Sequence, residues 1–99
     1  MWFAIIGEDV SDSLSLRKQL RPAHLERIQE LHRQGRVLIA GPHPKLSEDD
    51  SVNAGFSGSL MVVDFPDLAQ AKAWANDDPY TQGGVFESVL VKPFIQAVP

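Results

Sequence analysis

The stretch from Arg21 to Pro42 constrains the fold most, because it predicts a helix that turns directly into a buried strand. Leu25, Ile28 and Leu31 recur at spacings of three and four residues, which places them on one face of a helix. Gly35 follows this pattern, at the point where a glycine commonly ends a helix in the left-handed conformation. The apolar run after it is too short for a second helix. The stretch therefore predicts a helix, a tight turn and a strand.

The rest of the chain predicts three more strands and one more helix. Proline near the start of a helix is well tolerated, so Pro22 is expected in the first helical turn. Asp9 to Leu20 predicts a loop that leads into this helix, and Gly41 to Gly58 predicts a long loop. The four predicted strands are Met1–Gly7, Val37–Ala40, Ser59–Phe65 and Val85–Ile95, and the second helix is Pro66–Asn76 with Asp67 as its N-cap.

This order, β-α-β-β-α-β, predicts an α+β fold of the ferredoxin-like type, with two helices on one face of a four-stranded antiparallel sheet. The length of 99 residues predicts a single domain over residues 1–99. The second face of the sheet carries aromatic and branched side chains and would be uncovered. An uncovered apolar face favours a second copy of the chain as its partner, so a homodimer is expected.

The composition excludes several classes of protein. The chain has 9 basic and 13 acidic residues, a net charge of −4 and no clustering of the basic residues, which argues against binding to nucleic acid. It has no cysteine, so disulfides and thiol nucleophiles are excluded. The first residues do not form a signal peptide, and no run approaches the roughly 18 apolar residues of a membrane span. A soluble, cytoplasmic protein is expected.

His24 and Asp78 are the candidate catalytic pair. His24 is expected in the first turn of the helix, and the Asp78-Pro79 turn could bring a carboxylate to it. A histidine that a carboxylate orients is the arrangement that general acid–base catalysis needs. The alternative is an ordinary histidine near a helix start and a solvent-exposed aspartate at a helix end.

Four further side chains are candidates for binding a substrate, and each has a structural alternative. Arg21 could hold an anionic group next to His24 or form a weak surface ion pair. Ser59 could donate a hydrogen bond to a substrate or simply begin a strand, because its surroundings do not match a nucleophile elbow. Tyr80 and Phe86 could form a pocket wall, although Tyr80 could equally well only pack in a turn.

No metal or cofactor is predicted. The histidines His24, His32 and His43 do not show the spacing of a helical zinc site, and no motif brackets them. His32 falls in the apolar stripe and is expected to be partly buried, whereas His43 could line a loop or be exposed. The glycine-rich segments match neither a phosphate loop nor a dinucleotide fingerprint, so no nucleotide cofactor is implied.

Several short blocks, in order along nearly the whole chain, resemble the YciI family, also called YCII-related proteins. The most specific feature is the combination of a histidine after Arg-Pro-Ala with a later Asp-Pro-Tyr. The blocks are Arg21–Leu25, Gly35–Pro42, Gly55–Ser59, Asp77–Tyr80 and Val91–Phe94.

The resemblance implies a ferredoxin-like subunit that pairs into a dimeric α+β barrel, with a site centred on His24 and Asp78. Related dimeric barrels act on small, often aromatic or lactone-like molecules without a bound metal, and dehydrochlorination has been attached to the family. We therefore expect an acid–base enzyme with isomerase, lyase or dehydrochlorinase-like chemistry, working as a homodimer or a higher oligomer. The alternative is a non-catalytic module that binds a metabolite or a protein partner.

Overall fold

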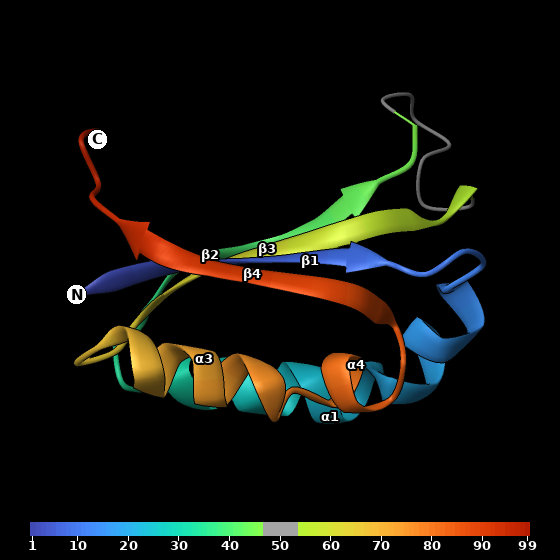
Figure 1. Cartoon of the computed structure of the whole chain (residues 1–99), viewed down its shortest axis with the longest axis horizontal. Helices are drawn as coiled ribbons and strands as arrows, with labels where there is room; N and C mark the ends of the chain where they lie inside the picture. The colour runs from blue at the N-terminus through green and yellow to red at the C-terminus, as the bar shows by residue number, and fades with distance from the viewer. Residues whose placement is uncertain (47–53) are drawn as a thin grey trace.

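Four strands form one antiparallel sheet, and all helices of the described residues lie on one of its faces (Figure 1). The computed structural model describes residues 1–46 and 54–99. The strand order is β2-β3-β1-β4, which confirms the predicted ferredoxin-like α+β fold. The strands are β1 (Trp2–Asp9), β2 (Val37–Pro44), β3 (Phe56–Asp64) and β4 (Phe86–Phe94), and the helices are α1 (Leu14–Arg33), α3 (Leu68–Asn76) and α4 (Pro79–Gln82).

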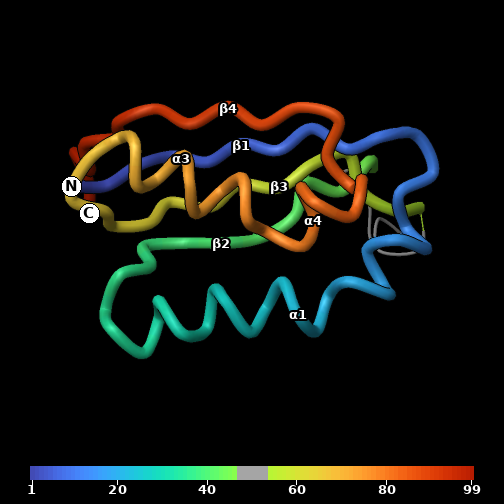
Figure 2. Tube along the Cα trace, turned by 60° about the horizontal axis from the view of Figure 1, so that its bottom comes forward, coloured from blue at the N-terminus to red at the C-terminus, as the bar shows by residue number. Residues whose placement is uncertain are grey.

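The core lies between the sheet and the helices. Alternation along each strand points every second side chain toward the helices, so Phe3 and Ile5 of β1 meet Met61 and Val63 of β3 in one apolar cluster. The helices complete this cluster with Ile28, Leu31, Ala71 and Ala75. Helix α3 packs on β1 and β4, while α1 runs along the β2 side of the sheet (Figure 2).

Helix α1 begins at Leu14, so the prediction of a loop as far as Leu20 is wrong. The leucines in this part of the helix are irregularly spaced because they face two different places. Leu16 and Leu20 pack on a second apolar cluster, formed by Tyr80, Val85 and Phe86, whereas Leu14 lines a cavity. Pro22 is consequently inside the helix and not in its first turn. Gly35 does adopt a positive φ of 73° after the helix, as predicted. No helix of residues 1–46 and 54–99 is both long and apolar enough to cross a membrane.

Strands β2 and β3 extend into the region predicted as a long loop. β2 continues to Pro44 and β3 begins at Phe56, so the loop prediction for Gly41–Gly58 is wrong at both ends. Proline is tolerated in β2 because this strand lies at the edge of the sheet, where one side needs no N–H donors. Residues 47–53 lie outside the described residues.

The helices after β3 begin with side-chain caps. Asp67 accepts a hydrogen bond from the backbone N–H of Gln70 at 2.9 Å, which confirms it as the N-cap of α3. Asp78 caps the short helix α4 in the same way, by accepting from the N–H of Tyr80 at 2.8 Å. Helix α4 was not predicted. It fixes the positions of its N-cap Asp78 and of Tyr80.

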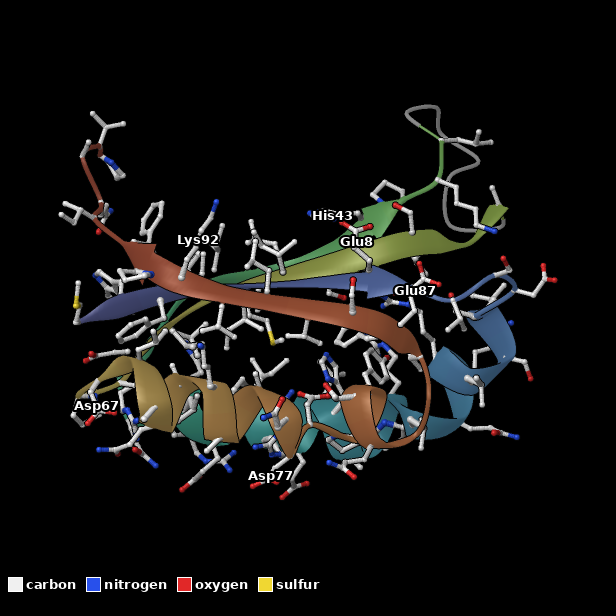
Figure 3. The ribbon with its side chains drawn as sticks, in the orientation of Figure 1. Glu8, His43, Asp67, Asp77, Glu87 and Lys92 are labelled. Carbon is white, nitrogen blue, oxygen red and sulfur yellow. The ribbon has the colours of Figure 1, made fainter. Side chains whose placement is uncertain are left out.

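The opposite face of the sheet carries no helix among the described residues. Figure 3 shows Glu8, His43 and Lys92 pointing away from the helices on this face. Apolar side chains lie among them: Leu90, which shares the face of Lys92, is 53% exposed, and Ile39 is 54% exposed. We call this surface the open sheet face.

Candidate functional site

His24 and Asp78, separated by 54 positions in the sequence, form a buried hydrogen bond of 2.7 Å between Nδ1 and Oδ1. Asp78 is completely buried, and its Oδ1 also accepts the N–H of Tyr80. Because this oxygen acts as an acceptor, Nδ1 of His24 is the donor and carries the ring proton. His24 lies in the middle of α1, so the prediction that it occupies the first turn of the helix is wrong.

Tyr80 stacks on His24 and fixes the plane of the imidazole ring. The two ring centroids are 3.8 Å apart and the planes differ by 7°. The phenol donates a hydrogen bond to the carbonyl oxygen of Arg17 at 3.3 Å. Burial raises the pKa of the Tyr80 phenol, although the guanidinium groups of Arg17 and Arg21 oppose this shift. Tyr80 is therefore a neutral donor at physiological pH.

Phe86 supports Tyr80 from behind. Its ring packs edge-on against Tyr80, at a centroid distance of 5.7 Å and an angle of 88°. It was predicted to form part of a pocket wall, but it is not among the side chains that line the cavity described below. Phe86 thus lies behind the cavity, against Tyr80 and 6.0 Å from the Arg17 guanidinium.

Arg27 approaches Asp78 from the side opposite to His24. Its Nη1 lies 3.4 Å from Oδ2 of Asp78, and neither buried atom has a hydrogen-bond partner within the part of the chain that the structure describes. Nη2 donates to the carbonyl oxygen of Trp74 at 2.8 Å, and the guanidinium lies over the Trp74 ring. The carboxylate of Asp78 is thus placed between an imidazole and a guanidinium.

Arg17 is a site residue that the sequence interpretation missed. It forms a two-point ion pair with Asp9, at 2.6 Å from Nε and 2.9 Å from Nη2. Nη2 also donates to the carbonyl oxygen of Gly58 and to the hydroxyl of Ser59. The spacing of Arg17, Arg21 and His24, four and three residues apart, would have placed it on the same helix face had the helix been extended.

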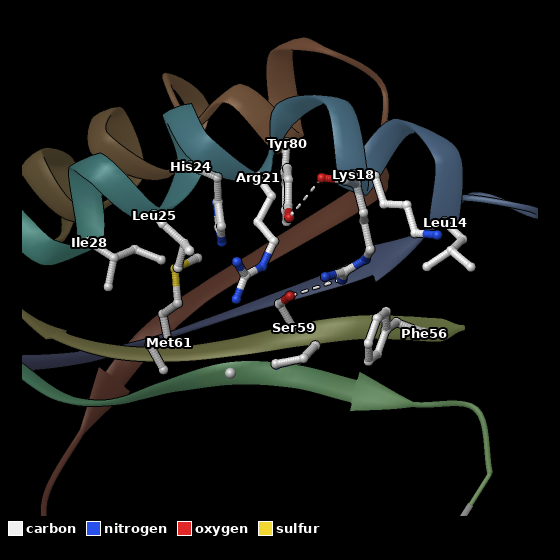
Figure 4. Close-up of a pocket in the computed structure, with 14 residues that line it drawn as sticks. Leu14, Lys18, Arg21, His24, Leu25, Ile28, Phe56, Ser59, Met61 and Tyr80 are labelled. Carbon is white, nitrogen blue, oxygen red and sulfur yellow. Dashed lines mark hydrogen bonds between the residues drawn. The ribbon is translucent and has the colours of Figure 1, made fainter. Parts of the chain in front are cut away.

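These side chains meet at a cavity of about 640 Å³ between α1 and strands β2 and β3. Four predicted site residues line it, namely Arg21, His24, Ser59 and Tyr80, whereas Asp78 lies behind His24. Figure 4 shows the side chains of Arg21 and His24 directed from α1 toward the sheet, with Ser59 below them. The remaining wall is formed by Leu14, Arg17, Lys18, Leu25, Ile28, Ala40, Gly41, Pro42, Phe56 and Met61.

The other two histidines do not belong to this site. His32 is exposed on α1, so its predicted partial burial is wrong; it lies beside Leu31, which takes the position that faces the core. His43 is exposed on the open sheet face (Figure 3). Within residues 1–46 and 54–99, no three side chains of the metal-ligating types gather into a cluster.

The geometry equips His24 to accept a proton from a molecule in the cavity. With Nδ1 bonded to Asp78, the lone pair is on Nε2, which has no hydrogen-bond partner among the described residues. A proton taken up at Nε2 would create an imidazolium that Asp78 stabilises. The stacking with Tyr80 holds the ring for this transfer.

A family model and two relatives match most of the chain. A model of the YCII-related domain matches residues 1–95. Protein YciI of Escherichia coli O6:H1 is 49% identical, over 95% of this chain and 96% of its own. An uncharacterized protein of Haemophilus influenzae is 39% identical over the same shares of the two chains.

A solved structure shares the fold. It is the 5-chloro-2-hydroxyhydroquinone dehydrochlorinase TftG of Burkholderia phenoliruptrix, in complex with 2,5-dihydroxybenzoquinone. The TM-score is 0.84, with coverage of 98% of this chain and 96% of that chain. At 22% sequence identity, the likeness concerns the fold.

Proposed function

The chain belongs to the YCII-related family, and from this premise we propose that it is an enzyme that transfers a proton on a small organic molecule. His24 is the base of this reaction. The observation that supports the proposal most directly is the buried His24–Asp78 hydrogen bond of 2.7 Å at the wall of a cavity. A histidine that is oriented by a carboxylate and open to a cavity is a typical general base.

In the proposed step, a C–H or O–H bond of the bound molecule breaks and an N–H bond forms at Nε2 of His24. The electron pair stays on the substrate, and Asp78 balances the positive charge of the ring. Arg21 and Ser59 bind polar groups of the substrate, since both line the cavity beside His24. Tyr80 keeps the ring in place by stacking.

Two classes of reaction follow from such a step. If the proton returns to a different atom of the substrate, the reaction is an isomerisation. If the electron pair left on the substrate forms a new double bond and a leaving group departs with the electrons of its own bond, the reaction is an elimination. TftG is named a dehydrochlorinase, and loss of hydrogen chloride is an elimination. We therefore propose isomerase or lyase chemistry for the chain.

Replacement of the base tests this function. A screen of small hydroxylated aromatics and lactones would identify a turned-over substrate, for which His24→Asn is expected to lower kcat by about 10²–10⁴-fold. His32→Asn is the matched control, because His32 is exposed on α1, outside both the cavity and the open sheet face, and it should retain the wild-type kcat. Stopped-flow or steady-state kinetics with each variant measures both values.

A His24→Asn variant that turns over its substrate at the wild-type rate would remove His24 from the mechanism. A ligand that binds in the cavity and is recovered unchanged by the wild-type protein would instead support a metabolite-binding module. Thermal unfolding of both variants checks that each still folds.

We also propose that the functional unit is a homodimer. The open sheet face exposes Leu90 and Ile39 by more than half, and Leu60, Ile6 and Leu90 pair across three neighbouring strands into one apolar row. A second copy related by a two-fold axis would bury this row on both partners.

A further inference from the structure

The charged side chains at the cavity wall are all cationic. Arg17, Lys18 and Arg21 line it together with His24, and no carboxylate of residues 1–46 and 54–99 does. Asp9 and Asp78 are buried behind Arg17 and His24, the groups that they bind.

The buried charges of the site cancel in pairs. Arg17 is paired with Asp9. Asp78 has Arg27 as its cationic partner, at 3.4 Å, while His24 in its base form is neutral. These two pairs therefore leave no net charge at the site to hold an anion.

Lys18 and Arg21 are different. Within residues 1–46 and 54–99, neither forms a hydrogen bond or an ion pair, and both line the cavity. The positive charge of Arg21 also opposes the rise that burial causes in the pKa of the Tyr80 phenol. Tyr80 is the residue that stacks on His24. The cavity thus carries two positive charges that the described protein does not balance.

Much of the remaining wall is apolar. Leu25, Ile28 and Met61 lie on one side of the cavity, and Phe56 and Leu14 lie on the other (Figure 4). A cavity with an apolar wall and a few convergent polar groups suits a ligand of mixed character. Such a ligand would present an apolar body to these side chains and an anionic group to Arg21.

We propose that the substrate class is a small organic anion, a carboxylate or a phenolate, whose charged oxygen binds Arg21 beside His24, while Lys18 adds positive charge at the Leu14 end of the cavity. This inference deepens the proposed function and rests on it for the role of the cavity. Arg21 is one helical turn from His24, so the bound anion lies next to Nε2. Arg21 would also stabilise the additional negative charge that forms when His24 removes a proton.

Equilibrium binding of benzoate and benzamide tests the substrate class without any turnover. The two probes have nearly the same shape, and only benzoate carries a charge. Titrations followed by NMR would use the wild-type protein and the variants Arg21→Gln, Lys18→Gln and Lys72→Gln. Lys72 is the matched control, because it is an exposed cation on α3 that does not line the cavity.

We expect benzoate to bind the wild type about tenfold more tightly than benzamide, and added salt to weaken only benzoate. Arg21→Gln should weaken benzoate by about tenfold and Lys18→Gln by a smaller factor, while benzamide is unaffected. Lys72→Gln should behave as the wild type.

Equal affinity for the two probes, no benzoate-induced shifts at His24 and Arg21, or equal loss in the Lys72 variant would overturn the proposal. These results would not depend on catalysis. A failure of His24 as the base would be seen only in the turnover assay of His24→Asn, so the two proposals fail separately.

Discussion

Arg27 lies against the buried carboxylate of Asp78. Asp78 is wholly buried, and its Oδ2 has no hydrogen-bond partner among the described residues but lies 3.4 Å from Nη1 of Arg27. Removal of one member of a buried ion pair leaves an uncompensated charge, which costs much more than the pair itself contributes.

Arg27→Met is therefore expected to lower the free energy of unfolding by roughly 2–4 kcal/mol. Urea unfolding at neutral pH measures this value. Arg33→Met is the control, because Arg33 forms an exposed ion pair with Glu30 and should cost less than about 1 kcal/mol. An equal loss in the two variants would show that Arg27 does not compensate the charge of Asp78.

Tyr80 gives the site a pH dependence at alkaline pH. Burial raises the pKa of its phenol above the ordinary value of 10.0. As the pH rises past about 10, the unfolded chain loses this proton while the folded protein keeps it, so the free energy of unfolding falls until the pH passes the folded pKa.

Tyr80→Phe should remove this part of the alkaline loss of stability, which urea unfolding at pH 9 and above would show as a shallower slope than that of the wild type. Since Tyr80 is the only tyrosine of the chain, the ultraviolet absorbance of tyrosinate reports its titration directly. A tyrosine that titrates at or below its ordinary pKa in the folded protein would contradict the prediction.

At the scale of elements, α1 carries most of the site on one face. Arg17, Arg21 and His24 all point from it toward the cavity, and the sheet provides Ser59 opposite them. Strand β1 supports the site indirectly, because its Gly7 makes room for Phe86, which in turn backs Tyr80.

Gly7→Ala should destabilise the protein, since a Cβ at Gly7 would lie 2.6 Å from the Phe86 ring. Overpacking of this kind costs about 1–3 kcal/mol. Gly41→Ala is the matched strand control: no atom lies within 4 Å of its Cβ position, and a change within about 1 kcal/mol of wild type is expected. Denaturant unfolding compares the two, and equal effects would mean that Phe86 moves aside freely.

At the scale of the molecule, the helices of residues 1–46 and 54–99 cover one face of the sheet and leave the other open, so the proposed dimer has a clear test (Figure 1). Leu90→Lys places a charge in the open sheet face and should shift the protein from dimer toward monomer in sedimentation equilibrium. Leu68→Lys is the control, because Leu68 is an exposed leucine on α3. A wild-type protein that sediments as a monomer at all concentrations would refute the dimer.

Local patterns predicted the elements whose cause is local. The Gly35 turn and the Asp67 cap depend on neighbours in the sequence, and the structure has both where they were expected. The first turns of α1 were missed because their buried residue is charged. Arg17 is buried by bonding to Asp9 and Ser59, and a pattern of apolar residues does not indicate such contacts. Helix α4 was missed because its four residues are too few for a periodic pattern.

By itself, the sequence determined the order of strands and helices, the fold class and the residue types available for acid–base chemistry, because these follow from local propensity and spacing. Only the tertiary structure decided which of those residues meet. It placed Asp78 at 2.7 Å from His24, stacked Tyr80 on the ring and brought Arg17 to Ser59. Such contacts depend on the packing of α1 and α4 against the sheet, since side chains 54 positions apart become neighbours only when the core forms.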